Sequence, residues 1–100
     1  MDKSIFHQQV KAALIKSGWT ITHAPYLVRI TDVIKLQIDL GAENAIGAER
    51  YREKIAVEIK SFISDSDINA FHIALGQYLN YSKGLSKQEP DRTLYLAVSV

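Results

Sequence analysis

Asp39, Glu58 and Lys60 have the residue types and the spacing of a site that could act on a phosphate ester. Glu58 and Lys60 are two positions apart in the alternating segment 55–62, so a strand there projects both side chains from one face, about 7 Å apart. Asp39 lies on the polar face near the end of a second alternating segment, 33–40. If the two strands pair, Asp39 and Glu58 converge on one point with Lys60 beside them.

The converging side chains would offer a small set of hard oxygen ligands. Two carboxylates and a strand carbonyl, such as that of Ile59, suit Mg²⁺ or Mn²⁺, and such an ion can generate hydroxide and neutralise charge on a phosphate under attack. Lys60 would then place a point charge on the phosphate or position the water. The alternative interpretation is a solvent-facing strand on which Glu58 and Lys60 are ordinary surface charges.

A predicted helix at 67–81 brings a fourth candidate, Gln77. This helix carries two apolar stripes on nearly opposite sides, one made of Ile68, Phe71, Leu75 and Leu79, the other of Ala70, Ile73, Ala74 and Tyr81. A helix that is apolar on two sides is expected between the sheet and a second layer, which the first helix, later residues or a partner subunit would supply. Gln77 lies in the second stripe and could reach the sheet to bind a water or a phosphate; a glutamine that binds backbone is the alternative.

The elements expected to position these residues run in the order helix, three or four strands, helix, strand. Their ranges are a helix from Asp2 or Ser4 to 17, extended segments at 19–22 and 26–30, a strand at 33–40 ended by Gly41, a short strand at 45–48, a turn at 51–53, a strand at 55–62, a helix at 67–81, a loop at 84–90 and a strand at 93–100. Because a helix joins the last two strands, we expect them to be parallel with a right-handed crossover, and the earlier strands to be antiparallel. The fold class is therefore mixed α/β.

Other potential ligands lack a metal-binding pattern. His7, His23 and His72 are scattered over a helix, a loop and a second helix. His7 is interpreted as a helix-surface residue or as one that lines a site near the first helix. Glu43, shortly after Asp39, is either a further ligand or a turn residue.

Composition indicates one small domain. The chain has 100 residues, 47% of them hydrophobic, a formal net charge of +1 and no cysteine, which excludes a disulfide framework and a thiolate nucleophile. The longest apolar run near the C-terminus, 94–98, is far shorter than the ~20 residues that span a bilayer, so we expect no membrane association and a cytoplasmic protein. The net charge argues neither for nor against a nucleic-acid partner. Because the chain stops at Val100 inside a predicted strand, we expect the native C-terminal end to be missing.

Several long strings of the sequence closely resemble the XisH family, also called the fdxN element excision controlling factor. They are FHQQVKAALIKSGWTITHAPY at 6–26, IDLGAE at 38–43, IAVEIKSF at 55–62, FHIALGQYLNY at 71–81 and QEPDRTLYLAV at 88–98. The resemblance covers essentially all 100 residues in order. It implies a restriction-endonuclease-like, PD-(D/E)XK core, a mixed sheet flanked by helices in the order α-β-β-β-α-β.

The resemblance also implies site residues. Asp39 matches the lone aspartate of the PD-(D/E)XK pattern, Glu58 and Lys60 match its (D/E)XK pair, and Gln77 matches a glutamine that some members carry on the following helix. Ile38 stands where the pattern has proline. Eighteen residues separate Asp39 from Glu58, which leaves room for an extra strand and for Glu43 or Glu49 as competing ligands.

The resemblance further implies a role in the programmed, site-specific excision of a DNA element in filamentous nitrogen-fixing bacteria. The expected partners are DNA, a recombinase that exchanges the strands, a small XisI-like companion protein and a second copy of the chain. Three functions stay open: a Mg²⁺-dependent DNA endonuclease that serves excision, a non-catalytic protein that binds a partner or steers a recombinase, and a nuclease of a mobile-element or defence system.

Overall fold

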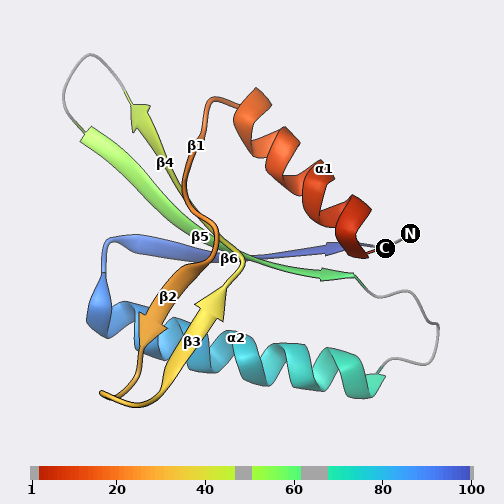
Figure 1. The fold of residues 1–100 in the computed structure, drawn as a ribbon, viewed down its shortest axis with the longest axis vertical. Coiled ribbons are helices and arrows are strands. Elements are labelled where there is room, and N and C mark those ends of the chain that lie inside the picture. The colour runs from red at the N-terminus through yellow and green to blue at the C-terminus, as the bar shows by residue number, and fades with distance from the viewer. Residues whose placement is uncertain (1–2, 47–50, 62–67, 100) are drawn as a thin grey trace.

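The computed structural model describes residues 3–46, 51–61 and 68–99 of the chain. Its elements are α1 (Lys3–Lys16), β1 (Thr20–His23), β2 (Tyr26–Arg29), β3 (Lys35–Ile38), β4 (Leu40–Ile46), β5 (Tyr51–Ser61), α2 (Ile68–Gln88) and β6 (Arg92–Ser99) (Figure 1). The predicted mixed α/β class is confirmed. The predicted order α-β-β-β-α-β is wrong in one respect, because five strands rather than three or four precede α2. Neither of the two described helices is long and apolar enough to cross a membrane.

The strands form two separate sheets. A four-stranded sheet has the order β1-β4-β5-β6, and β2 and β3 form a two-stranded hairpin. The pairs β1–β4, β4–β5 and β2–β3 are antiparallel, whereas β5 and β6 are parallel and α2 connects them, as predicted. In Figure 1, α1 lies on one side of the larger sheet, and α2 lies on the other side with the hairpin.

Each face of the larger sheet has its own apolar core. The odd positions of β5 pack with the α1 side, in a cluster that also includes Leu40 and Ala42 and has Phe6, Val10, Leu14 and Trp19 at its edge. Ala56, an even position, belongs to a second cluster that joins the hairpin to α2 and β6. Because side chains alternate along a strand, Glu58 and Lys60 share the face of Ala56. α2 lies on that side of the sheet, and Glu58 is only 5% exposed, so the interpretation of Glu58 as a solvent-exposed surface charge is wrong.

Asp39 marks a break in the strand predicted at 33–40. The segment divides into β3, which belongs to the hairpin, and β4, which begins at Leu40 in the larger sheet, with a bend at Asp39 between them. Gly41, which was predicted to end a strand, instead lies inside β4. A Cβ atom there would lie 3.0 Å from both His23 Nδ1 and Tyr26 Cδ2, so close packing accounts for the glycine.

Two further boundaries differ from the prediction. Residues 51–53 belong to β5 rather than to a turn, and α2 continues to Gln88 instead of ending near Tyr81. The part of the predicted short strand at 45–48 that is described belongs to β4, and 47–48 lie outside the described residues. Gly84, expected in a loop, lies inside α2, where it packs against the hairpin.

Replacing Gly84 by alanine should destabilise the protein, because a Cβ atom there would lie 2.6 Å from Ile30 Cδ1 and 2.8 Å from Val28 Cγ1. Val28 is fully buried and has little room to move, so we expect a net loss of about 1–2 kcal/mol after the gain in helix propensity. Gly76→Ala is the matched control on the same helix, since nothing lies within 4 Å of its added Cβ, and it should stabilise by about 0.5–1 kcal/mol. Urea denaturation of both variants measures the free energy of unfolding. If the two substitutions changed it equally and in the same direction, the close helix–hairpin contact would be contradicted.

Candidate active site

The carboxylates of Asp39 and Glu58 meet at the start of β4. The β4–β5 register pairs Leu40 with Val57, which places Asp39 next to Glu58. Glu58 Oε1 accepts a hydrogen bond from the Asp39 backbone N–H at 3.2 Å, and Asp39 Oδ2 accepts one from the Ile59 N–H at 2.8 Å. Each carboxylate is thus held by the backbone of the other's segment. The sequence prediction that these two side chains converge agrees with this geometry.

Lys60 is the cation of the site. Its Nζ lies 3.5 Å from Glu58 Oε2, and its side chain is 25% exposed, against 7% for that of Glu58. Lys60 is therefore the more solvent-accessible member of this ion pair.

Burial and like charge make the ionised carboxylate pair unfavourable. The pKa of Glu58 is raised to about 7, first because burial removes water from its carboxylate, and then because Asp39 adds a negative charge and a side-chain hydrogen bond. Lys60 opposes this shift without cancelling it. Glu58 is buried and Asp39 half-buried, and a divalent cation would stabilise the fully ionised form of such a carboxylate pair.

Tyr81 is a site residue that the sequence analysis placed only in an apolar stripe. Its side chain is buried, and its pKa is raised by burial, by the charges of Glu58 and Asp39, and by a hydrogen bond to Glu58. Gln77 precedes Tyr81 by one helical turn on the same side of α2. Its Oε1 is buried and has no hydrogen-bond partner among the described residues. The four-residue spacing of Gln77 and Tyr81 places both side chains on one face of the helix, but the sequence does not show which face of the sheet this helix covers.

The donor set fits a hard divalent cation of the Mg²⁺ class. Mg²⁺ is commonly held by one or two carboxylates, with waters and substrate phosphate oxygens completing its shell. Asp39 and Glu58 supply that number of carboxylates. In the part of the chain that the structure describes, no group of three or more His, Cys, Asp and Glu side chains could hold a metal ion.

The other candidate ligands are not part of this pair. Glu43 lies on β4, where its carboxylate oxygens are 4.0 Å from Arg52 Nη1 and 4.0 Å from Arg92 Nη2. His7 is on α1, across the sheet from the face that carries Glu58. Glu49 lies outside the described residues.

A second charged cluster surrounds Arg92, whose side chain is only 2% exposed. Its guanidinium group binds both carboxylate oxygens of Glu89, at 2.9 and 3.3 Å, and donates to the Ile55 carbonyl at 2.8 Å. It also lies over the Tyr26 ring, 4.6 Å from the centroid, and the Tyr26 hydroxyl donates to Glu89. Because the protein itself satisfies each of these charges, we interpret this cluster as structural.

Comparisons with known proteins identify similar chains. The family described as XisH protein matches residues 1–100. An XisH family protein from Nostoc punctiforme PCC 73102 is 46% identical, with a TM-score of 0.78 over 94% of this chain and 68% of that one. An fdxN element excision controlling factor protein from Anabaena variabilis is 47% identical, with a TM-score of 0.79 over 95% of this chain and 68% of that one. A search of curated proteins found no match.

Proposed function

Because the chain belongs to the XisH family, we propose that it controls the excision of a DNA element and does so as a metal-dependent DNA endonuclease. Excision control is suggested by the name of the Anabaena variabilis protein, which shares nearly half of its aligned residues with this chain. The endonuclease activity and the PD-(D/E)XK relationship are our own extension, and they rest on the site geometry.

The Asp39–Glu58 pair, in which Glu58 is buried and Asp39 half-buried, with Lys60 Nζ 3.5 Å from Glu58, is the observation that carries the proposal. An ionised Glu58 lowers the stability of the fold, because its carboxylate is desolvated beside a second carboxylate. An uncharged side chain would serve the fold better, so stability alone does not account for a carboxylate at this position. Groups whose pKa values are displaced by burial and like charge cluster at functional sites.

In this proposal Asp39, Glu58 and the Ile59 carbonyl would hold Mg²⁺ or Mn²⁺. When bound, the ion supplies Lewis-acid stabilisation of a phosphodiester and lowers the pKa of water. The remaining work belongs to the side chains. Lys60 would orient the attacking water and place its charge near a phosphate oxygen. A new P–O bond would form as the bond to the leaving sugar oxygen breaks, while the attacking water gives a proton to solvent and the leaving oxygen takes one from solvent.

The helix residues would position these groups. Tyr81 would donate a hydrogen bond from its hydroxyl to Glu58 and so hold that carboxylate from the α2 side. The buried Oε1 of Gln77 would accept a hydrogen bond from the water or from a polar group of the substrate. Both roles depend on α2 covering this face of the sheet.

A non-catalytic role is the second candidate, favoured by an apolar surface on the outer side of α2. Leu75 and Leu79, one helical turn apart on the same side of α2, are 44% and 60% exposed. Such a surface suits a protein partner, such as a small XisI-like companion or a recombinase. In that case the carboxylate pair would bind no metal and DNA would not be cut.

Calorimetric titration with Mg²⁺ and Mn²⁺ separates the two candidates. We expect one ion to bind each chain of the unmodified protein, and Asp39→Asn and Glu58→Gln each to weaken binding by about tenfold or more, because each removes one carboxylate ligand. Glu53→Gln is the matched control on the same strand and should bind as the unmodified protein does. If the unmodified protein takes up no ion, or if both variants still bind it, the endonuclease proposal fails and the non-catalytic candidate replaces it.

A further inference from the structure

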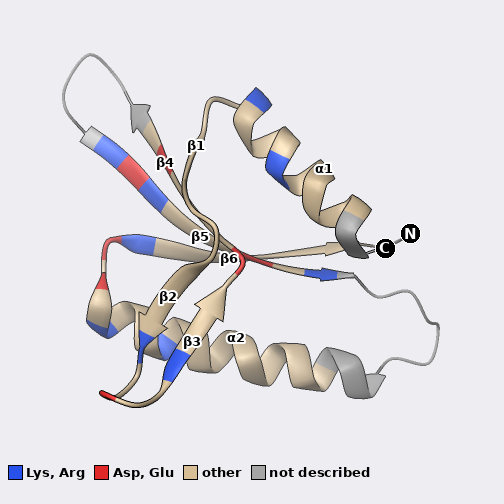
Figure 2. Cartoon of the chain, in the orientation of Figure 1, with Lys and Arg blue, Asp and Glu red and all other residues tan. Residues whose placement is uncertain are grey.

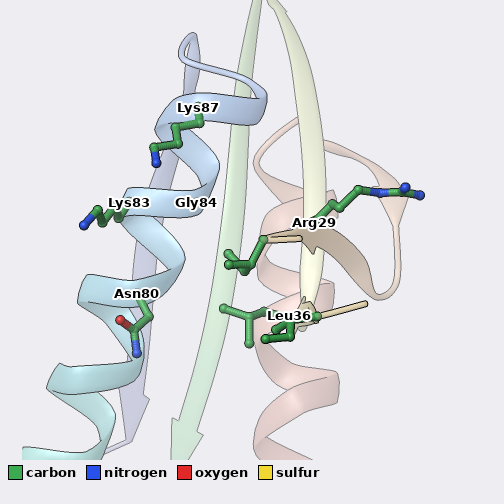
Figure 3. Close-up of a pocket in the computed structure, with 8 residues that line it drawn as sticks. Arg29, Leu36, Asn80, Lys83, Gly84 and Lys87 are labelled. Carbon is green, nitrogen blue, oxygen red and sulfur yellow. The ribbon is translucent and has the colours of Figure 1, made fainter. Parts of the chain in front are cut away.

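A groove separate from the carboxylate site lies between the β2–β3 hairpin and the C-terminal half of α2 (Figure 3). Its volume is about 450 Å³. Its inner wall is apolar, with Ile30, Ile34 and Leu36 on the hairpin side, and Gly84 forms part of the helix side. None of the candidate site residues lines it.

The charged residues that line the groove have one sign, whereas the hairpin turn beside it carries an acidic residue, Asp32, that does not line it (Figure 2). Arg29, Lys83 and Lys87 are among its lining residues, and none of the described residues that line it is acidic. Figure 3 shows these three side chains extending away from the cavity at its two walls, whereas Leu36 points across it toward α2. The apolar parts of the cationic side chains therefore line the groove, and their charged ends project outward from its two walls. An apolar interior with a charged rim is the arrangement of a protein-binding site.

Hydrogen bonds hold the two walls of the groove in place but leave the groove open to solvent. The Gln88 side chain accepts from the Arg29 N–H at 2.9 Å and donates to the Leu27 carbonyl at 3.0 Å, which fixes the hairpin to the end of α2. The Thr31 hydroxyl oxygen accepts from the Ile34 N–H at 2.9 Å and so holds the turn. Even so, Ile30 and Ile34 remain 43% and 53% exposed. A rigid site that leaves large apolar side chains in water gains affinity from a ligand that covers them.

We propose that this groove binds an acidic segment of a partner protein that carries bulky apolar side chains. The apolar side chains of the partner would fill the space beside Ile30, Ile34 and Leu36, and its carboxylates would pair with the cations at the rim. DNA is the less favoured occupant, because a phosphate backbone would pair with the cations but would leave the isoleucines in contact with water and charge.

The test is a titration of the full, ¹⁵N-labelled chain with three synthetic peptides of about sixteen residues, monitored by NMR. The first peptide has leucines at helical spacing and glutamates elsewhere, the second has lysines in place of the glutamates, and the third has serines in place of the leucines. We expect only the acidic, leucine-bearing peptide to shift the amide signals of Ile30, Ile34 and Gly84, with a Kd on the order of 10 µM.

Charge reversal at the rim provides the second arm. Lys83→Glu together with Lys87→Glu should weaken binding of the acidic peptide by about tenfold or more, because attraction becomes repulsion. Lys11→Glu together with Lys16→Glu on α1 is the matched control, since it changes the net charge equally and also alters a lysine in the last turn of a helix. This control should bind the peptide as the unmodified chain does.

Four results would overturn the proposal. The first is that the acidic peptide, at millimolar concentration, leaves the amide signals of the groove residues unchanged, and the second is that the lysine peptide binds equally well. The third is that a DNA duplex shifts these signals instead, with strong salt dependence, and the fourth is that the signals shift with the concentration of the protein alone. The third result would assign the groove to nucleic acid, and the fourth would assign it to a second copy of this chain.

Discussion

Replacing Glu58 by glutamine is expected to abolish DNA cleavage while making the metal-free protein more stable above pH 7. The variant keeps the shape of the side chain and an oxygen that can accept from the Asp39 N–H, but it removes one of the two carboxylates. On the proposed mechanism, cleavage should fall by at least about a hundredfold. Relaxation of a supercoiled plasmid in the presence of Mg²⁺ measures this loss.

The stability effect has the opposite sign because the pKa of Glu58 is raised to about 7 in the folded protein, from an ordinary value of 4.5. Between these two values the folded chain keeps a proton that the unfolded chain has released, so stability falls as pH rises, and the full loss is present above pH 7. Removing the charge should therefore stabilise by about 1–3 kcal/mol at pH 8 and by little at pH 4. Urea denaturation in EDTA at both pH values gives the difference.

Two companion variants make this result specific to the site. Glu53→Gln, on the same strand, should change neither cleavage nor the pH dependence of stability. Lys60→Ala should also abolish cleavage, but it should lower stability at pH 8, because it removes the cation 3.5 Å from Glu58. Cleavage that persists in both Glu58→Gln and Lys60→Ala would remove these residues from the mechanism. A Glu58→Gln variant that is less stable at pH 8 would show that the carboxylate serves the fold.

The fold could be predicted from sequence where one short-range pattern determines one element. The alternation in 55–62 and the following helix predicted the β5–α2–β6 unit and its parallel pairing, because a strand, a helix and a strand have few ways to connect. Prediction failed at Asp39 and at Gly84, where the same local pattern fits two structures. The run 33–40 alternates without interruption, but residues 35–38 belong to the hairpin whereas Leu40 begins a strand of the larger sheet. Gly84 is typical of a helix end, but there it permits close packing inside a helix.

The site shows the same limit. The meeting of Asp39 and Glu58 followed from the pairing of two strands, and this needed only the spacing of each residue along its strand. The burial of Glu58 and the contribution of Tyr81 could not be predicted, because they depend on which face of the sheet α2 covers. Burial is also what raises the pKa of Glu58, so the property that most favours a functional role appears only in the folded chain.

Arg92→Met is expected to cause the largest loss of stability, about 3–5 kcal/mol at pH 7. The guanidinium group is 2% exposed, and it joins Glu89 to the carbonyl of Ile55 and to the ring of Tyr26. Methionine fills similar space but leaves Glu89 without its main cation. Arg52→Met is the matched control, since that side chain is 63% exposed and lies 4.0 Å from Glu43, and it should change stability by less than about 0.5 kcal/mol.

At acid pH, the free energies of unfolding of the Arg92→Met variant and the unmodified protein should differ by less than at neutral pH. The hydrogen bonds from Arg92 are the main reason that the pKa of Glu89 lies at about 2, below its ordinary 4.5. A lowered folded-state pKa gives stability that is present above pH 4.5 and is lost as pH falls toward 2, by about 1–2 kcal/mol for a partly exposed carboxylate. Denaturation at pH 5.5 and pH 2.5 measures the change, and Glu89→Gln should also show a smaller acid loss than the unmodified protein. The loss of stability caused by Arg92→Met could instead be the same at both pH values. Arg92 would then stabilise the protein through its contacts with the Ile55 carbonyl and the Tyr26 ring, and not through the charge of Glu89.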